Sequence, residues 1–496
     1  MFAVFSRLEK NQVGVVPVFF VLLSAVLVRI VLEWVLEAGH ALEEPASLFL
    51  FLLYFSVTLS GILFLVWRFS GKPLLSVAKV VAGFSWVLWV PPVFDFLWSG
   101  GRGFVLSFVF SATNFWGAFA SFCSSCVGVS IGLRVEVALL LAAVLWYVFW
   151  ASKSLVRGLL AVLAVYAWVI FGALFPGFLM GAFGHAFQDA FLFRETLSAY
   201  AVALSLFVIA FFSSQKTLWS AFWQRFRVER SLHYLGMVLL GSALGFSFWG
   251  HAFPGVLLVL AALALGVVFA FEAAVWVNDS FDSGIDRVSN PVRAKLVSSF
   301  TSHQRLFLVV LVGLSALNGL AAGFGLWLWI VFALALSVAY SVPPLRLRAH
   351  FLSSSLVIGL CSTAVFLAGF GAGLLEPGKV FSVVPLEWVF MVFGFVFLAS
   401  PLVCLKDADG DRKAGVVTLA SFLGLKKAWW VVLALTVLAV AWAAYFAPVS
   451  WWVAGFFIVA LAAAFVWTRF DAFRLERFAF ALEYLFLLVV ALRLAS

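Results

Sequence analysis

The chain has 496 residues, of which 65% are hydrophobic and only 11% are charged, and its mean hydropathy is +1.16. These values exclude a soluble globular protein and indicate a polytopic membrane protein. The net charge of +9 does not indicate nucleic-acid binding, because the basic residues occupy short connections, where they set membrane orientation and contact lipid head groups.

Seven apolar segments precede residue 216. They lie at residues 15–36, 48–67, 75–98, 103–132, 135–152, 156–183 and 196–213. Seven crossings, an odd number, would put the start of the chain and the connection at 216–230 on opposite sides of the membrane. The basic residues of both, including Arg7 and Lys10 at the start, predict that both are cytoplasmic. We therefore expect one segment, 103–132, to be re-entrant, since Ser, Thr, Asn and Gly interrupt it. Residues 1–215 are thus predicted to form a membrane domain of six or seven helices.

A basic stretch at 214–230 predicts an interfacial connector to a second domain, residues 216–496. Nine apolar runs follow, at 232–249, 254–277, 304–322, 325–341, 352–374, 385–405, 427–446, 450–468 and 477–495. Basic residues gather in alternate connections, which is the positive-inside pattern. The expected fold is all-α: a nine-helix membrane bundle behind a separate helical membrane domain.

Two acidic clusters interrupt the second domain. One reads Asn278-Asp279-Ser-Phe-Asp282-Ser-Gly-Ile-Asp286, and the other reads Lys406-Asp407-Ala-Asp409-Gly-Asp411-Arg412. A carboxylate at the centre of a membrane helix costs about 2.5–3.5 kcal/mol, so clustered carboxylates there indicate function. Their hard oxygens suit Mg²⁺, which bridges carboxylates to substrate phosphates. The clusters predict a magnesium-dependent diphosphate site at the cytoplasmic membrane face, although either cluster alone is also typical of a solvated loop.

Helical geometry groups these carboxylates. At about 100° per residue, the three aspartates of the first cluster fall within roughly 60° of one another. In the second cluster Asp407 and Asp411 share a face, whereas Asp409 points roughly the opposite way if the stretch is helical.

Three stretches resemble the motifs of the UbiA-type intramembrane prenyltransferases. Residues 278–293 are similar to the first aspartate motif, 340–348 to the loop between the fourth and fifth helices, and 407–419 to the second aspartate motif. The resemblance covers about residues 216–496. It implies Mg²⁺-dependent transfer of an isoprenoid chain from a prenyl diphosphate to a hydrophobic acceptor that enters from the bilayer.

Individual residues take roles from the positions that match these motifs. The implied metal ligands are Asp279, Asp282, Asp286, Asp407 and Asp411. The implied catalytic residues are Asp279, Asp282, Asp411 and Tyr340, and the implied substrate-binding residues are Asn278, Arg293, Ser341, Arg346, Arg348 and Lys406. Arg227 and Arg230 are weaker phosphate candidates, and Glu272 is either a base or a neutral, hydrogen-bonded side chain.

Two departures from the family pattern leave alternatives open. Ala294 replaces a usual proline, and the second motif is shortened, so that either Asp407 or Asp409 partners Asp411. The acceptor is either lipid-type or aromatic. A rival function, a cation-coupled transporter, calls for charges in broken mid-membrane helices and for related repeats. For residues 1–215 the alternative is a scaffold or lipid-delivery module without chemistry.

Overall fold

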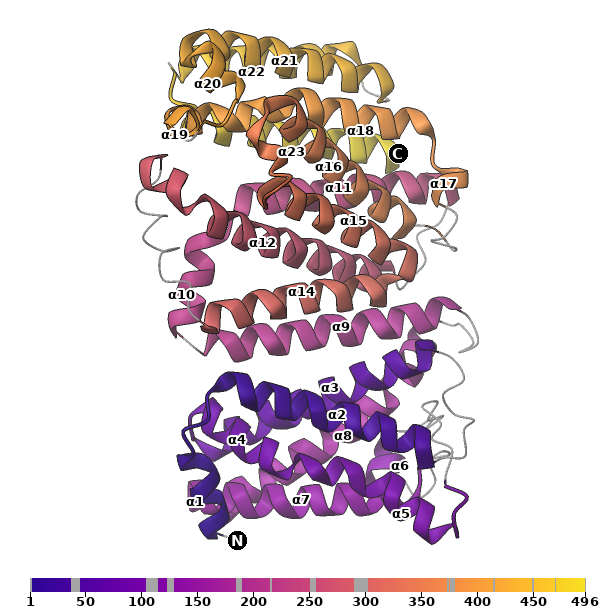
Figure 1. Ribbon diagram of the computed structural model, residues 1–496. Helices are drawn as coiled ribbons and strands as arrows, with labels where there is room; N and C mark the ends of the chain where they lie inside the picture. The colour runs from indigo at the N-terminus through magenta and orange to yellow at the C-terminus, as the bar shows by residue number, and fades with distance from the viewer. Residues whose placement is uncertain are drawn as a thin grey trace. The chain divides into compact units, whose positions relative to one another are not determined.

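The computed structural model divides into two compact units, Met1–Gln215 and Lys216–Ser496 (Figure 1). It describes residues 2–36, 45–103, 115–122, 129–183, 190–214, 216–249, 256–289, 302–372, 374, 380–413, 415–447, 450–468 and 470–495. Within these residues the regular structure is helical, apart from an isolated bridge between His350 and Val417.

Thirteen of the described helices are long and apolar enough to cross a membrane, six in the first unit and seven in the second. Helices dominate because a segment in lipid must satisfy every backbone hydrogen bond internally. The predicted fold class, an all-α integral membrane protein, is confirmed.

The first unit packs around α3. Its elements are α1 (Phe2–Lys10), α2 (Val15–Leu36), α3 (Pro45–Ser70), α4 (Leu74–Phe84), η1 (Ser85–Trp89), α5 (Val90–Trp98), α6 (Phe115–Ala120), α7 (Ile131–Ser152), α8 (Leu155–Phe183) and α9 (Ala190–Ser213). Helix α3 contacts α2, α4, α7, α8 and α9. Within the predicted re-entrant segment, α6 is too short to cross a membrane, and residues 104–114 and 123–128 lie outside the described residues. The re-entrant path therefore stays a prediction.

A buried ionic cluster joins three elements of the first unit. The guanidinium of Arg29 in α2 contacts Glu33, lies 3.4 Å from Oε2 of Glu136 in α7, and donates to the Leu88 carbonyl of η1 at 2.5 Å. The Arg29 side chain is 0% exposed. This cluster fixes α2 against α7 and η1, and our sequence analysis did not single it out.

The second unit contains the predicted apolar runs as helices. Its elements are α10 (Lys216–Arg225), α11 (Val228–Trp249), α12 (Val256–Ser289), α14 (Ser302–Ala322), α15 (Phe324–Ser341), η2 (Leu347–Ala349), α16 (Phe351–Ala372), α17 (Val380–Val383), α18 (Leu386–Ala399), η4 (Ser400–Asp407), α19 (Ala408–Lys413), α20 (Leu419–Leu423), α21 (Leu425–Phe446), α22 (Trp451–Trp467) and α23 (Ala472–Ala495). All nine runs coincide with helices, although α22, with 17 residues, and α23 are not among the thirteen candidate spans.

Helix α16 lies at the centre of this unit, between α11, α15 and α18. Glycines bring α11 and α16 close together. A Cβ added to Gly241 would lie 2.1 Å from the Phe366 carbonyl oxygen, and one added to Gly369 would lie 2.2 Å from that of Val238. Small residues allow such close backbone approach between membrane helices, so α11 is held firmly on α16.

The stretch predicted as an interfacial connector packs into the second unit. Arg225, at the end of α10, is 1% exposed, and its guanidinium lies 4.5 Å from the ring centre of Trp276 in α12. Phe222 packs against Phe307 of α14. The basic residue Arg225 is therefore buried against an aromatic ring rather than placed in lipid head groups, because its apolar neighbours anchor α10 on α12 and α14.

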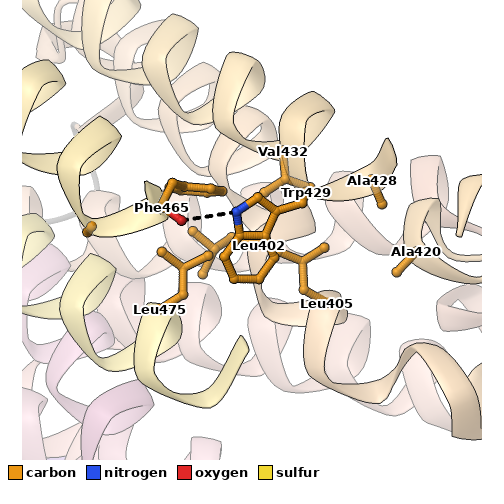
Figure 2. Close-up of a cluster of buried hydrophobic side chains, with 9 residues drawn as sticks. Leu402, Leu405, Ala420, Ala428, Trp429, Val432, Phe465 and Leu475 are labelled. Atoms are coloured by element: carbon orange, nitrogen blue, oxygen red, sulfur yellow. Dashed lines mark hydrogen bonds between the residues drawn. The ribbon is translucent and has the colours of Figure 1, made fainter. Parts of the chain in front are cut away.

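An apolar cluster, drawn in Figure 2, includes two residues of η4, the segment that ends at Asp407 of the second acidic motif. It contains Leu402 and Leu405 of η4 together with Ala420, Ala428, Trp429, Val432, Ala464, Phe465 and Leu475. The indole Nε1 of Trp429 donates to the Phe465 carbonyl at 3.2 Å. The cluster fixes η4, and with it the start of the segment that carries Asp407 and Asp411.

Candidate active site

The first acidic motif lies near the end of α12, which continues without a break through Asn278, Asp279 and Asp282. Asp279 is 1% exposed and Asp282 is 3% exposed. Two arginines face them: Nη2 of Arg227 lies 3.4 Å from Oδ1 of Asp279, and Arg348 contacts Asp282. These buried carboxylates are thus partly neutralised by guanidinium groups from other parts of the chain.

The second acidic motif begins in the 3₁₀ turn η4 and continues in α19. Asp411 is buried, Asp407 is half-buried and Asp409 is exposed. Asp409 was predicted to point away from Asp411, which agrees with the exposure of Asp409 and the burial of Asp411. The assumption of one α-helical stretch is wrong for Asp407, because the chain is 3₁₀ from Ser400 to Asp407 and changes to α-helix only at Ala408.

The loop after α15 joins the two motifs. Arg348 contacts Asp282 of α12, and its Nη2 lies 3.7 Å from Oδ1 of Asp411 in α19. Nη2 of Arg346 lies 3.9 Å from Oδ1 of Asp282. Burial lowers the pKa of Arg348, and the charges of Asp411 and Asp407 oppose this shift. Arg348 therefore connects both acidic clusters.

Backbone contacts fix this loop on the segment that follows the second motif. Val417 N donates to the Ala349 carbonyl at 2.8 Å, and Phe351 N donates to the Val417 carbonyl at 2.9 Å. The loop also contains a cis peptide bond between Pro343 and Pro344. The three stretches that resemble family motifs thus meet at one place in the second unit.

A cavity of about 200 Å³ adjoins this place. Its polar end is lined by Arg227, Arg230, Asn278, Tyr340 and Ser341, and the rest is largely apolar, with side chains from α12, α16, α18, α21, α22 and α23. The Asn278 amide donates to the Ser341 hydroxyl at 3.0 Å, and the Tyr340 hydroxyl lies 3.3 Å from that of Ser354. The aspartates do not line the cavity, but Asn278 and Arg227 connect it to Asp279.

Lys406, which the motif predicts to bind substrate, pairs with a carboxylate of α23. Its Nζ lies 2.8 and 2.6 Å from the two carboxylate oxygens of Glu476 in α23, and Nη2 of Arg230 lies 3.4 Å from the same group. Burial raises the pKa of Glu476, but the charges of Arg230 and Lys406 lower it by a larger amount. The pKa of Glu476 therefore lies below its usual range. Glu476 was not predicted as a site residue. In the sequence it is a single acidic residue among the basic residues at the start of α23.

The carboxylate of Glu272 binds the start of α11 through hydrogen bonds. This buried carboxylate accepts hydrogen bonds from Arg227 N at 3.3 Å and from the Ser231 hydroxyl at 3.1 Å. It therefore positions Arg227 beside Asp279. Two roles were predicted for Glu272, a base and a neutral, hydrogen-bonded side chain. These contacts match a hydrogen-bonded side chain and give no support to a base.

Two buried carboxylate oxygens at this place can accept a cation. Within the described part of the chain, Oδ1 of Asp282 and Oδ1 of Asp411 are buried without a hydrogen-bond partner, as are oxygens of Glu33 and Glu272 elsewhere, and arginine nitrogens lie 3.9 and 3.7 Å from the two aspartate oxygens. Both are hard oxygen donors of the kind that Mg²⁺ prefers. Among the described residues no three acidic, histidine or cysteine side chains converge into a metal-binding group, since Arg348 lies between the two carboxylates. The Asp286 side chain and all of Arg293 lie outside the described residues.

The fold and these motifs define an integral membrane protein with a paired aspartate site. The sequence model of the UbiA prenyltransferase family matches residues 235–488, just over half of the 496 residues. The chain belongs to this family, and the predicted resemblance is confirmed. The first 215 residues lie outside the match.

Individual proteins are similar to parts of this chain. The chain is 30% identical over 158 residues to homogentisate phytyltransferase of Synechocystis sp., covering 30% of this chain and 50% of that protein. It is 29% identical over 215 residues to digeranylgeranylglyceryl phosphate synthase of Methanoregula boonei, covering 42% and 70%. The chain spans about half the length of the Synechocystis protein. A solved UbiA homolog from Archaeoglobus fulgidus, bound to GPP and Mg²⁺, matches with 18% identity and a TM-score of 0.41 over 55% of this chain and 99% of that one.

Proposed function

We propose that the second unit transfers an isoprenoid chain from a prenyl diphosphate to a hydrophobic acceptor, with Mg²⁺ as cofactor. One observation carries this proposal. Arg348 brings Asp282 and Asp411 together beside a cavity that is polar at one end and apolar beyond it. Such a cavity suits a substrate with a charged head and a hydrocarbon tail.

The chain's own groups can bind the diphosphate head. Asp282 and Asp411, with Asp279 and Asp407, would hold Mg²⁺, and the first two each have a buried oxygen that accepts no hydrogen bond from the described residues. When bound, the ion neutralises diphosphate charge and stabilises the leaving group as the C–O bond breaks. Arg348, Arg346 and Arg227 supply guanidinium donors, which form strong charge-assisted hydrogen bonds with phosphate oxygens. Asp286 and Arg293 stay predicted contributors.

The remaining polar groups would orient the donor at the cavity entrance. Tyr340 and Ser341 line the cavity next to Asn278, where they can hydrogen-bond the diphosphate or flank the cationic prenyl carbon. Lys406 acts on this site through charge, since Glu476 already binds its ammonium. The apolar part of the cavity would exclude water from the reactive prenyl carbon.

The active site would face the cytoplasm. Arg346, Arg348 and Lys406 belong to the connections that the positive-inside pattern assigns to that side. The named relatives act on an aromatic acceptor in one case and on a lipid in the other, and both acceptor classes fit this proposal. A cation-coupled transporter has no comparable support.

The test uses full-length protein reconstituted in nanodiscs with a series of prenyl diphosphates and a membrane extract. We expect prenyl diphosphate binding that requires Mg²⁺ and is lost with a chelator. We also expect a prenylated lipid or aromatic product that mass spectrometry detects. Protein that is folded yet binds no prenyl diphosphate in Mg²⁺ and forms no product would contradict the proposal.

A further inference from the structure

A second pair of ionisable side chains lies on the cavity wall, beyond the diphosphate end. Nδ1 of His233 in α11 is 2.6 Å from Oε1 of Glu483 in α23, and Nε2 is 2.9 Å from the Ser362 hydroxyl of α16. A carboxylate only accepts hydrogen bonds when ionised, so Nδ1 then carries the hydrogen and donates it to Glu483. Contacts on both nitrogens fix the imidazole ring in one orientation.

The pair lies deeper than the ionic contacts at the cavity entrance. Helices α11 and α23 pack side by side, and Arg230 pairs with Glu476 near their first turns. His233 lies three residues beyond Arg230 and Glu483 lies seven beyond Glu476. At 1.5 Å per residue, these steps are about 5 Å and about 10 Å along the helices. The pair is therefore displaced from the diphosphate site toward the interior of the membrane.

The pair is accessible from the cavity. Both His233 and Glu483 line it, with side chains that are 10% and 15% exposed. Phe271, Phe480 and Phe486, which also line the cavity, are apolar. A carboxylate placed among such residues is costly and, in membrane proteins, usually serves a substrate or a proton.

We propose that Glu483, oriented by His233, binds the hydroxyl group of the prenyl acceptor and takes its proton. This inference rests on the proposed transferase function and narrows its acceptor to a molecule with a free hydroxyl, either a phenol or a glycerol-type alcohol. The hydroxyl donates to the Glu483 oxygen that faces the cavity, while the other oxygen keeps its hydrogen bond from His233. The acceptor thus lies in the apolar part of the cavity, next to the tail of the prenyl donor.

In the transfer step one bond breaks at the acceptor, one breaks at the donor, and a new bond joins the two. The acceptor O–H bond breaks and its proton moves to the Glu483 carboxylate. The electron pair left on the acceptor oxygen, or on a ring carbon conjugated with it, forms the new bond to the prenyl carbon. The C–O bond to the diphosphate breaks, and the diphosphate leaves with that electron pair. When the bond forms at a ring carbon, the proton of that carbon passes to the released diphosphate, and Glu483 returns its proton to the acceptor oxygen, which restores the hydroxyl.

The test compares Glu483→Gln with wild-type full-length protein in nanodiscs. Geranylgeranyl diphosphate is the donor, and the acceptor probes are a hydroquinone and an alkylglycerol phosphate. Glutamine keeps the size and the hydrogen bond to His233 but is not a base. We expect kcat to fall about 10²-fold or more with the accepted probe, with Mg²⁺-dependent donor binding and donor KM unchanged. Glu483→Asp, which retains the carboxylate, should recover part of the lost rate.

Thr436→Val is the matched control. Thr436 lines the same cavity, but its hydroxyl already donates to the Val432 carbonyl of its own helix at 2.7 Å, so kcat should stay within about twofold of wild type. A Glu483→Gln variant with wild-type kcat overturns the inference and leaves the transferase function standing. Loss of donor binding in that folded variant also overturns it, since the pair would then serve the donor. A wild-type protein without any transfer refutes the proposed function instead.

Discussion

In the first unit, the charged groups within the apolar helices bind one another. Arg29 contacts Glu33, Glu136 and a backbone carbonyl, and its side chain is fully buried. In the second unit, Asp282 and Asp411 are also paired with an arginine, Arg348, but they lie beside a cavity whose lining includes charged and polar side chains. A buried ion cluster stabilises helix packing, whereas polar groups that converge on an otherwise apolar cavity are expected where a ligand binds.

The cavities show the same contrast. The first unit encloses about 100 Å³, lined by Glu136 and Tyr147, but Glu136 pairs with Arg29 and the Tyr147 hydroxyl lies 2.9 Å from Glu9. The second unit encloses about 200 Å³, and a row of polar groups lines one end of it. A membrane charge is therefore informative about function only together with its partners, and the predictions below test this distinction.

The largest expected effect is at the first acidic motif. Asp282→Ala or Asp279→Ala should reduce prenyl transfer about 10³-fold or more, because each removes a carboxylate proposed to hold Mg²⁺. Each substitution also removes the carboxylate from a buried ion pair with Arg227 or Arg348, so thermal unfolding of each variant is measured beside its rate and only folded protein is compared. Initial rates with saturating Mg²⁺ and prenyl diphosphate measure the effect. Ser280→Ala, on the same helix but exposed, is the control, and full activity of either aspartate variant would refute the magnesium site.

The second motif provides a test within a single turn. Asp411→Asn should lower transfer about 10²-fold, because Asp411 is buried beside Arg348, and Asp407→Asn should also be damaging. Asp409→Asn changes an exposed side chain and should leave the rate within about twofold of wild type. An inactive Asp409→Asn protein with an active Asp407→Asn protein would show that Asp409 is the partner of Asp411.

In the first unit, we expect a loss of stability instead of activity. Arg29→Met removes the cation from two buried carboxylates, which should cost about 3–5 kcal/mol. Thermal unfolding in detergent should therefore occur at lower temperature, while the protein that remains folded binds prenyl diphosphate normally. Arg68→Met, at an exposed position near the end of α3, is the control. Unchanged stability with lost transfer would give the Arg29 cluster a functional role.

The sequence predicted the helices and the motifs better than the contacts between them. Long apolar runs and clustered carboxylates are local signals. The nine runs coincide with long helices of the second unit, and the carboxylate clusters contain Asp282 and Asp411, which Arg348 brings together. The pairing of Lys406 with Glu476, and of His233 with Glu483, joins residues 70 and 250 positions apart. Such contacts depend on how helices pack, which no local pattern determines. The pair of Arg29 and Glu33, four residues apart in one apolar helix, was a local signal that could have been noticed.

The smallest expected effect comes from removing the first unit. Every described residue proposed to bind the prenyl diphosphate lies between 216 and 496, and this stretch forms a compact unit with its own apolar cluster. The fragment 216–496, expressed alone in detergent or nanodiscs, should therefore bind prenyl diphosphate in Mg²⁺ with an affinity within about threefold of the full chain, since it keeps every described residue proposed to bind the donor. Turnover falls more than binding if residues 1–215 shape the acceptor's entrance. A folded, monodisperse fragment that no longer binds the donor would show that the first unit contributes groups to the site, and the contrast between a self-neutralised unit and a ligand-binding unit would then be wrong.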